Sequence, residues 1–128
     1  MRLLLDTHAF LWWLAGDASL PVPVQEVVAD PANSIFVSAA SAWEIATKHR
    51  IGRLPEVTAI IGDIEAAIQD QGFVPLAITT RHAQVAGGLP GPHRDPFDRM
   101  LIAQAMIEDM VLVSNEAPFD AYGVRRLW

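Results

Sequence analysis

Five acidic residues of this chain stand where carboxylates could act as one site. The sequence has 15 acidic residues, and five of them follow a predicted strand or fall in an early turn of a predicted helix: Asp6, Glu44, Asp95, Asp98 and Glu116. Carboxylates a few ångströms apart raise one another's pKa, and a bound divalent cation relieves that repulsion. Oxygen donors without cysteine or paired histidines favour Mg²⁺ or Mn²⁺ over zinc. The pattern therefore predicts a hard-cation site, provided that the fold brings these acids together.

The position of the acids depends on a parallel sheet. Leu3–Leu5 is an apolar run that ends at Asp6 and precedes a helical pattern, which is typical of a buried strand with Asp6 at its carboxyl end. Ligands of open α/β sheets bind at that edge. Glu44 lies in the helix after the second predicted strand and Glu116 lies just after the fourth, so a parallel sheet gives all three the same edge. Asp98 joins them only if its helix begins at that edge, as right-handed crossovers allow.

Apolar periodicity and turn residues predict alternating strands and helices. Strands are expected at 3–5, 35–37, 73–78 and 110–113, with a candidate fifth at 124–127. Helices are expected at 7–16, 24–29, 38–50, 55–71, 79–88 and 96–108. The best-marked helix has Asp95 as its N-cap and Pro96 in its first position. This order implies an α/β fold, a three-layer α/β/α sandwich with a mostly parallel, four- to five-stranded sheet, in a single domain over 1–128.

Composition limits the classes of protein that fit. The 128 residues are 52% hydrophobic, yet no apolar run approaches the ~20 residues of a membrane span, and no signal peptide precedes the first strand. Zero cysteines favour a reducing cytoplasm. The net charge of −6 argues against a broad nucleic-acid-binding face. A small acidic site that holds a phosphate through a cation remains compatible with that charge.

Each acid also has a purely structural interpretation. Asp6 and Asp95 are suitable N-caps, and the segment Ser41 to Glu44 matches a capping box. Asp98 would be favoured by the helix dipole in any early helical position. Glu116 could be a solvated loop residue. The functional interpretation therefore depends on the whole set at these topological positions rather than on any one residue.

The histidines and tryptophans form no motif of their own. No two histidines have metal-ligand spacing: His8, His49, His82 and His93. We expect His49 and His82 at the surface or in packing, and we expect His93 beside the acidic site. Three tryptophans are expected in the core or at an interface, with base stacking as the less favoured alternative: Trp12, Trp13 and Trp43.

Four segments of the chain resemble PIN-domain ribonucleases of the VapC toxin type, from bacterial toxin–antitoxin pairs. In order, they are LLLDTHAFLWWL, SAASAWEIATKHRIGRL, HRDPFDRMLIAQA and LVSNEAPFDAYGV. Together they cover essentially the whole chain. The resemblance implies a PIN-like fold, with a parallel sheet between helices, and Mg²⁺- or Mn²⁺-dependent endonucleolytic cleavage of RNA.

The resemblance also implies which residues form the site. Catalytic and metal-binding roles fall on four acids: Asp6, Glu44, Asp98 and Glu116. In this hypothesis Asp6 and Asp98 hold the metal directly, and it activates a water that attacks the scissile phosphate and leaves a 5′-phosphate. The family usually has aspartate where this chain has Glu116, which reaches one methylene further and would bind through water or only tune the site. Three more residues are expected to orient carboxylates or waters: Thr7, Ser114 and Asp95.

Partners follow from the same resemblance. An RNA substrate needs positive charge beside the acidic centre, and five residues are candidates for phosphate contacts: Lys48, Arg50, Arg53, Arg94 and Arg99. The family forms homodimers and is neutralised by a small VapB-like antitoxin with a DNA-binding portion. The pI of about 5.0 suits a basic antitoxin segment. The apolar face of the first helix is a candidate surface for either partner, through Phe10, Trp13 and Leu14.

Two alternatives from other classes stay open. An aspartate after the first strand also serves as nucleophile in phosphatase and phosphotransfer domains. A haloacid-dehalogenase-like site would need an aspartate at position 8, where this chain has His8, and a receiver domain would need one where it has Ser38. The second alternative is a non-catalytic PIN-like module that only binds a partner. Four acids disfavour it, although the unusual Glu116 leaves it open.

Overall fold

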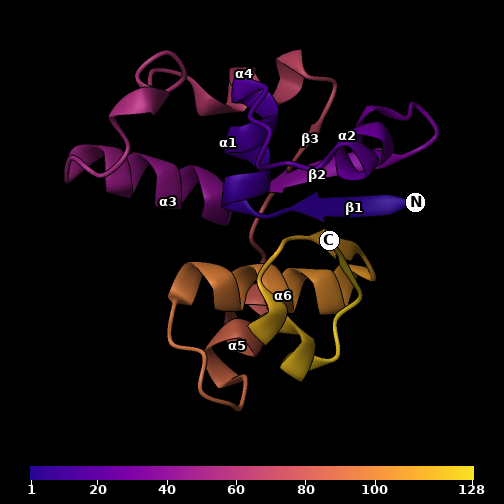
Figure 1. The fold of residues 1–128 in the computed structure, drawn as a ribbon. Helices are drawn as coiled ribbons and strands as arrows, with labels where there is room; N and C mark the ends of the chain where they lie inside the picture. The colour runs from indigo at the N-terminus through magenta and orange to yellow at the C-terminus, as the bar shows by residue number, and fades with distance from the viewer.

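The computed structural model describes residues 1–128, the side chain of Glu56 excepted. Across these residues five strands form one sheet in the order β3-β2-β1-β4-β5, and every neighbouring pair is parallel. Figure 1 shows the fold. The strands are β1 (Arg2–Leu5), β2 (Ser34–Ser38), β3 (Val74–Leu76), β4 (Val111–Val113) and β5 (Arg126–Leu127). The predicted α/β class and parallel sheet are confirmed.

Helices cover both faces of the sheet (Figure 1), with α1, α2 and α4 on one side and α5 and α6 on the other. Their bounds are α1 (Thr7–Ala15), α2 (Val22–Ala29), α3 (Ala39–Arg50), α4 (Ile64–Asp70), α5 (Thr80–Gly88) and α6 (Pro96–Glu108). Two 3-10 turns complete the chain: η1 (Pro55–Val57) and η2 (Ala117–Tyr122). Within the part of the chain that the structure describes, no helix is long and apolar enough to cross a membrane.

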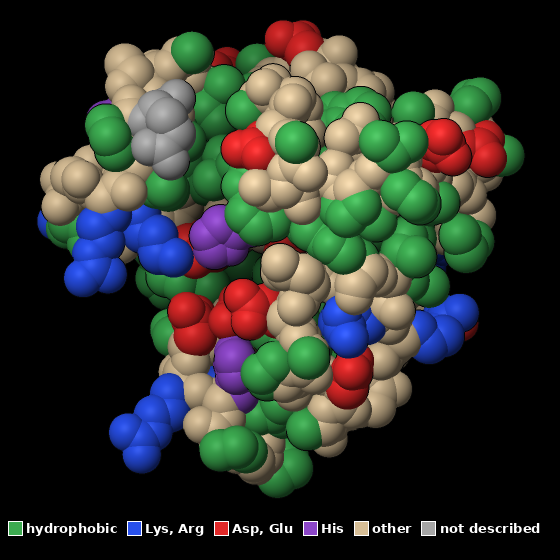
Figure 2. Space-filling model, viewed as in Figure 1, with side chains coloured by type: hydrophobic (Ala, Val, Ile, Leu, Met, Phe, Trp, Pro, Cys, Tyr) green, Lys and Arg blue, Asp and Glu red, His purple; other side chains and the backbone are tan. Residues whose placement is uncertain are grey.

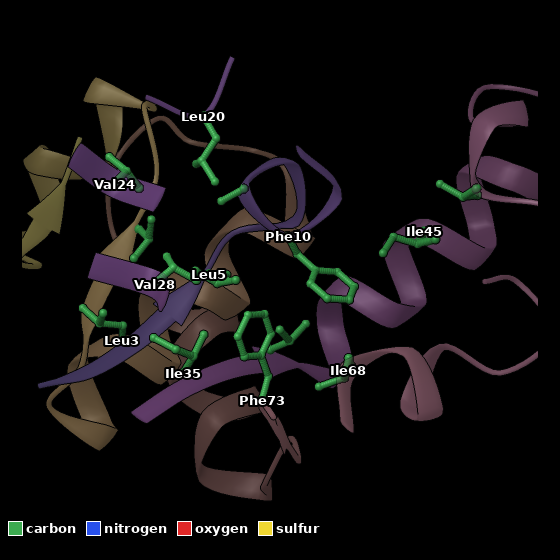
Figure 3. Packing of buried hydrophobic residues seen from close by; sticks show 14 residues of the cluster. Leu3, Leu5, Phe10, Leu20, Val24, Val28, Ile35, Ile45, Ile68 and Phe73 are labelled. Carbon is green, nitrogen blue, oxygen red and sulfur yellow. The ribbon is translucent and has the colours of Figure 1, made fainter. Parts of the chain in front are cut away.

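Strand β1 lies at the centre of the sheet. Its three leucines are buried, and they divide between the two faces of the sheet. Leu3 and Leu5 face the core shared with α1, α2, α3 and α4, which Figure 3 shows, and Leu4 faces the core shared with α6. Alternation of side chains along a strand makes this division unavoidable once the strand lies between two helical layers. The pairing of Leu5 with Val37 and with Val113 aligns the carboxyl ends of β1, β2 and β4. The residue after each of these strands therefore emerges at one edge.

The structure corrects several predicted boundaries. The predicted helix 55–71 is two separate pieces, because Pro55 begins only a short 3-10 turn and Asp63 caps a new helix by accepting from Ala66 N–H (2.9 Å). Helix α2 begins at 22 rather than 24, and the strands differ from their predicted bounds by one or two residues at an end. The Ser41–Glu44 capping box is wrong, since Ser38 caps α3 by accepting from Ala40 N–H (2.9 Å).

The predicted partner face of α1 is partly wrong. Phe10 is fully buried in the core, so it is not available to an antitoxin or a second subunit. Trp13 and Leu14 are half-buried and pack against the same core. Trp43, in contrast, leaves 60% of its surface exposed and does not belong to the core.

Candidate active site

The carboxyl edge of the sheet opens into an acidic cavity of about 140 Å³. In the space-filling view of Figure 2, acidic side chains gather around a hollow in the middle of the face, with histidines beside them. The cavity takes its lining from the chain just after β1 and β4, from the start of α1 and from helices α3 and α6: Asp6, Thr7, His8, Glu44, Lys48, Asp95, Asp98 and Glu116. The structure thus brings together all five acids that the sequence analysis singled out.

Asp6 is fixed at the end of β1 by the start of α1. Its carboxylate accepts from Ala9 N–H (2.7 Å), so it is the N-cap of that helix as well as a wall of the cavity. Burial raises the pKa of the Asp6 carboxyl, the negative charge of Glu116 raises it further, and hydrogen bonds from Ser114 and Ala9 partly oppose the rise. The capping interpretation and the site interpretation therefore apply to the same carboxylate.

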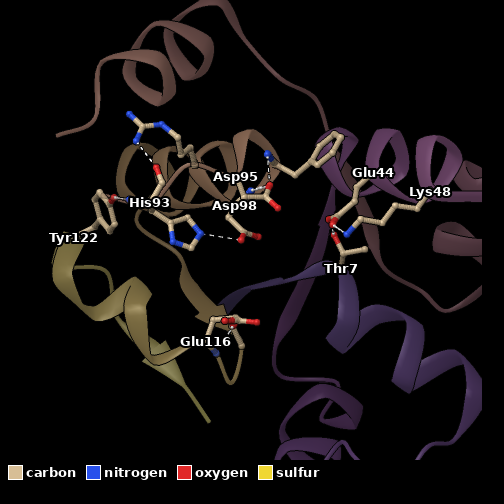
Figure 4. Close-up of polar contacts among 11 residues, drawn as sticks. Thr7, Glu44, Lys48, His93, Asp95, Asp98, Glu116 and Tyr122 are labelled. Carbon is tan, nitrogen blue, oxygen red and sulfur yellow. Dashed lines mark hydrogen bonds and ion pairs between the residues drawn. The ribbon is translucent and has the colours of Figure 1, made fainter. Parts of the chain in front are cut away.

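Glu44 is buried in the second turn of α3, and each of its oxygens has a separate partner. Oε1 accepts from the Thr7 hydroxyl (2.5 Å), which is also hydrogen-bonded to Ser41 Oγ (3.0 Å). Oε2 forms an ion pair with Lys48, one turn further along the same helix. Figure 4 shows Lys48 reaching back along α3 to this carboxylate. The Thr7 hydroxyl thus holds one oxygen of Glu44 in place.

Asp98 and Asp95 enter from the first turn of α6. Asp95 caps the helix by accepting from Phe97 N–H (2.8 Å) and Asp98 N–H (3.2 Å), as predicted. Burial raises the pKa of the Asp98 carboxyl to about 6. The charges of Asp95 and Glu44 add to that rise, and a hydrogen bond from His93 opposes it. A carboxyl in this state has an excess of negative charge around it and would gain from a bound cation.

The opposite wall comes from the chain after β4. Glu116 lines the cavity, and its backbone N–H donates to the buried hydroxyl of Ser114 (3.0 Å). Ser114 therefore fixes the backbone at Glu116, and it also opposes the rise in the pKa of the Asp6 carboxyl. Figure 4 shows the Glu116 carboxylate extending into the space between α6 and α1.

The loop before α6 holds His93 against Asp98. His93 Nε2 lies 2.8 Å from Asp98 Oδ2, and the His93 backbone N–H donates to Tyr122 Oη (3.2 Å). Arg99 fixes the loop by donating to three carbonyl oxygens, those of Ala86, Leu89 and His93. The Arg99 guanidinium is therefore engaged by backbone carbonyls instead of being available to an RNA phosphate.

The other candidate RNA contacts differ in their distance from the acids. Lys48 lines the cavity itself. Three arginines are exposed and do not line it: Arg50, Arg53 and Arg94.

Sequence reasoning missed two features of the cavity. His8 lines it, although its spacing gave no signal. The Glu44–Lys48 ion pair did leave a signal in the sequence, because a glutamate four residues before a lysine on a helix is the favourable orientation for such a pair. His82, in contrast, is a buried packing residue as predicted, and it completes the cap of α5 with Thr79.

The carboxylate oxygens in the cavity are suitable ligands for a hard cation, but they do not surround a single position at which one could bind. Among the described residues, no three His, Asp or Glu side chains lie close enough together to ligate a single ion. Two contacts occupy the carboxylates instead, Lys48 on Glu44 and His93 on Asp98. A cation held by Asp6 and Asp98, with Glu44 and Glu116 beside them, would therefore replace hydrogen bonds that these oxygens now make.

Replacing Thr7 by valine should lower the free energy of unfolding by about 1–2 kcal/mol. The change keeps the shape of the side chain but removes the donor to Oε1 of a buried carboxylate, which is left without that partner. Urea denaturation would measure the loss, and Thr7→Ser, which keeps the hydroxyl, should recover most of it. Equal stability of the valine and serine variants would contradict this role.

Comparison with known proteins decides the family. Residues 3–124 match the PIN domain. The chain belongs to the PIN domain family. The matched stretch covers nearly all of the sequence, so the PIN fold inferred from four short segments is confirmed.

Relatives of this PIN domain agree with the predicted VapC resemblance. It is 39% identical over 56 residues to ribonuclease VapC16 of Mycobacterium tuberculosis, a match that spans 44% of this chain and 40% of that protein. The fold matches VapBC2 of Rickettsia felis, solved bound to a DNA fragment from its promoter, with a TM-score of 0.73, 16% identity and 99% and 98% of the two chains covered. It also matches VapC20 of Mycobacterium tuberculosis, described as a sarcin–ricin loop cleaving toxin, with a TM-score of 0.63, 18% identity and 95% of each chain covered.

Proposed function

We propose that this PIN domain is a Mg²⁺- or Mn²⁺-dependent endoribonuclease and the toxin of a toxin–antitoxin pair, acting in the cytoplasm. One observation carries the proposal: Asp6, Glu44, Asp98 and Glu116, far apart in the sequence, line one cavity at the carboxyl edge of a parallel sheet. The name of the partial relative, ribonuclease VapC16, supports RNA as the substrate. Two proteins of similar fold, VapBC2 of Rickettsia felis and VapBC-1 of nontypeable Haemophilus influenzae, are toxin–antitoxin complexes and support the biological setting.

The residues of the cavity would have different roles in binding the cation and in positioning its ligands. Asp6 and Asp98 would hold the cation, and Glu44 and Glu116 would complete its surroundings through their own oxygens or through water. When bound, Mg²⁺ or Mn²⁺ supplies Lewis-acid activation of the phosphate and of a water nucleophile. Thr7 keeps Glu44 in place through its hydrogen bond, and Ser114 opposes the rise in the pKa of the Asp6 carboxyl. Asp95 fixes the start of α6 and thereby the position of Asp98.

The direct test is cleavage of RNA by the purified chain. Total cellular RNA would be incubated with the protein in Mg²⁺, in Mn²⁺ and in EDTA, and the new ends would be sequenced. The proposal expects cuts at defined sites, only with the cation, with 5′-phosphate ends. Cuts that persist in EDTA, or an inert protein that binds neither cation, would contradict it and favour the non-catalytic module.

A homodimer is part of this proposal, and the apolar groove beside Trp43 is its candidate interface. The groove lies between α3, α5 and α6, has a volume of about 200 Å³ and is bordered by Trp43, Phe97 and Met100. Trp43 packs edge-on against Phe97 at 4.9 Å between ring centroids but stays 60% exposed. The only charged side chain among the groove's lining residues, Arg99, already donates to backbone carbonyls. Such a surface can pair with a second copy without leaving a charge unpaired.

Replacing Trp43 by serine should therefore shift the protein from dimer to monomer. An aromatic residue at the centre of an interface is the kind whose truncation costs at least about 2 kcal/mol of binding energy, or a loss of affinity of about 30-fold. Light scattering after size exclusion would measure the mass over a range of concentrations. Val22→Ser, another exposed apolar side chain, is the control. A serine variant that stays dimeric at the same concentration would place the interface elsewhere.

A further inference from the structure

Lys48 is the only lysine in the sequence, and it lies in the acidic cavity. Within the described lining it is also the only lysine or arginine side chain, facing five carboxylates. Its ammonium is paired with Glu44 Oε2. Of the two partners, 28% of the Lys48 side chain is exposed and 4% of the Glu44 side chain. The lysine therefore reaches the cavity from its rim, whereas the carboxylate is part of its wall.

Glu44 does not need Lys48 to keep its position. Its other oxygen, Oε1, accepts from Thr7, and Thr7 is hydrogen-bonded in turn to Ser41. The ammonium can leave Oε2 while the carboxylate stays where it is. A lysine carries its charge on a flexible four-carbon stem, so such a movement requires only rotation of its side chain.

The charges in the cavity favour that movement once a divalent cation is present. Five carboxylates outnumber one ammonium, and the Asp98 carboxyl responds to the charge of Glu44, so the groups are close enough to interact. A cation bound among the same carboxylates competes with Lys48 for Glu44 and repels it. The phosphate of an incoming RNA attracts the ammonium at the same place.

We propose that Lys48 is a resident counter-ion that leaves Glu44 when the divalent cation binds and then contacts the RNA phosphate beside it. This inference depends on the proposed function, because it assigns a step in the loading of the same site. Lys48 is a positioning residue in this account: it holds charge in the empty cavity and places the substrate in the loaded one. The two roles predict opposite effects of its removal on cation affinity and on RNA affinity.

Three proteins separate these roles: wild type, Lys48→Met and Lys48→Arg. Methionine keeps an unbranched side chain, one atom shorter and without the charge, and arginine keeps the charge. Mn²⁺ affinity would be measured from the electron paramagnetic resonance signal of free Mn²⁺. RNA affinity would be measured in Ca²⁺ by fluorescence anisotropy of a labelled single-stranded RNA. Arg125→Met, at an exposed ion pair with Asp109, is the control for loss of one positive charge elsewhere.

Lys48→Met should bind Mn²⁺ about fivefold more tightly and RNA about fivefold more weakly, which is the effect of one partly exposed charge at close range. Lys48→Arg and Arg125→Met should stay near wild type in both measurements. If the wild type binds Mn²⁺ but Lys48→Met binds it no more tightly, or if its RNA affinity is unchanged, the Lys48 inference is overturned and the proposed function stands. A wild type that binds no Mn²⁺ overturns both.

A second measurement uses the wild-type sequence, so its result does not depend on whether a variant folds. Reductive methylation with ¹³C-formaldehyde labels Lys48 and the chain's N-terminal amine, since the chain has no other lysine. Titration with Mg²⁺ should shift the dimethyl-lysine resonance, and RNA added in Ca²⁺ should shift it again. A lysine resonance that stays in place through the Mg²⁺ titration would show that Lys48 does not leave Glu44.

Discussion

Asp98→Asn should reduce Mg²⁺-dependent RNA cleavage by at least about 100-fold, equivalent to about 3 kcal/mol of transition-state stabilisation. The change keeps the shape of the side chain and removes the charge that would hold the cation at the start of α6. Asparagine can still accept from His93, so the loop before the helix should stay in place. Asp6→Asn should act in the same direction, because its carboxylate lies across the same cavity. Initial rates of cleavage of one mapped RNA site would give the ratio.

The matched control is Asp109→Asn. Asp109 ends α6 in the left-handed conformation (φ 52°), which asparagine also adopts readily, and its side chain is exposed. That variant makes the same chemical change at the other end of the same helix and should cleave RNA at the wild-type rate. If Asp98→Asn cleaves RNA as fast as Asp109→Asn and wild type, Asp98 does not belong to the site.

Asp98→Asn should also stabilise the cation-free protein at neutral pH. Burial and neighbouring charges raise the pKa of the folded Asp98 carboxyl to about 6, above its ordinary value of 3.8. The folded protein therefore binds this proton more tightly than the unfolded chain does. The associated stability is present below about pH 4 and is lost as the pH rises through about 6. Two pKa units correspond to at most about 3 kcal/mol, and partial exposure reduces this to about 1–2 kcal/mol.

Urea denaturation in EDTA at about pH 4.5, 6 and 7.5 would test this expectation. The difference in unfolding free energy between Asp98→Asn and wild type should be near zero at the lowest pH and grow to about 1–2 kcal/mol at the highest. Added Mg²⁺ should then stabilise the wild type but not the variant, because a ligand that binds only the folded state adds to its stability. A difference that does not change with pH would contradict the raised pKa of Asp98.

The sequence was sufficient to predict where the acids converge, for a specific reason. The leucines of β1 are buried on both faces, which is typical of a parallel sheet between two helical layers. That topology brings Asp6, Glu44 and Glu116 to one edge. The cap and proline at Asp95–Pro96 fix the start of α6 and with it the position of Asp98.

What the sequence could not provide is the set of contacts that long-range packing creates. The bond from Thr7 to Glu44 joins residues 37 positions apart, and His93 meets Asp98 because Arg99 and Tyr122 fold the loop over α6. The predicted helix 55–71 was wrong because isoleucines at helical spacing also pack in two short pieces. The apolar periodicity of the sequence does not show that the helix is interrupted before Asp63.

The measurement that addresses the cavity most directly is anomalous X-ray scattering from crystals grown with Mn²⁺. We expect one strong manganese peak within coordination distance of the Asp6 and Asp98 carboxylates, absent from crystals of Asp98→Asn. Well-ordered wild-type crystals that show no manganese there, or show it only at other surface carboxylates, would contradict the claim that these distant acids form one cation site.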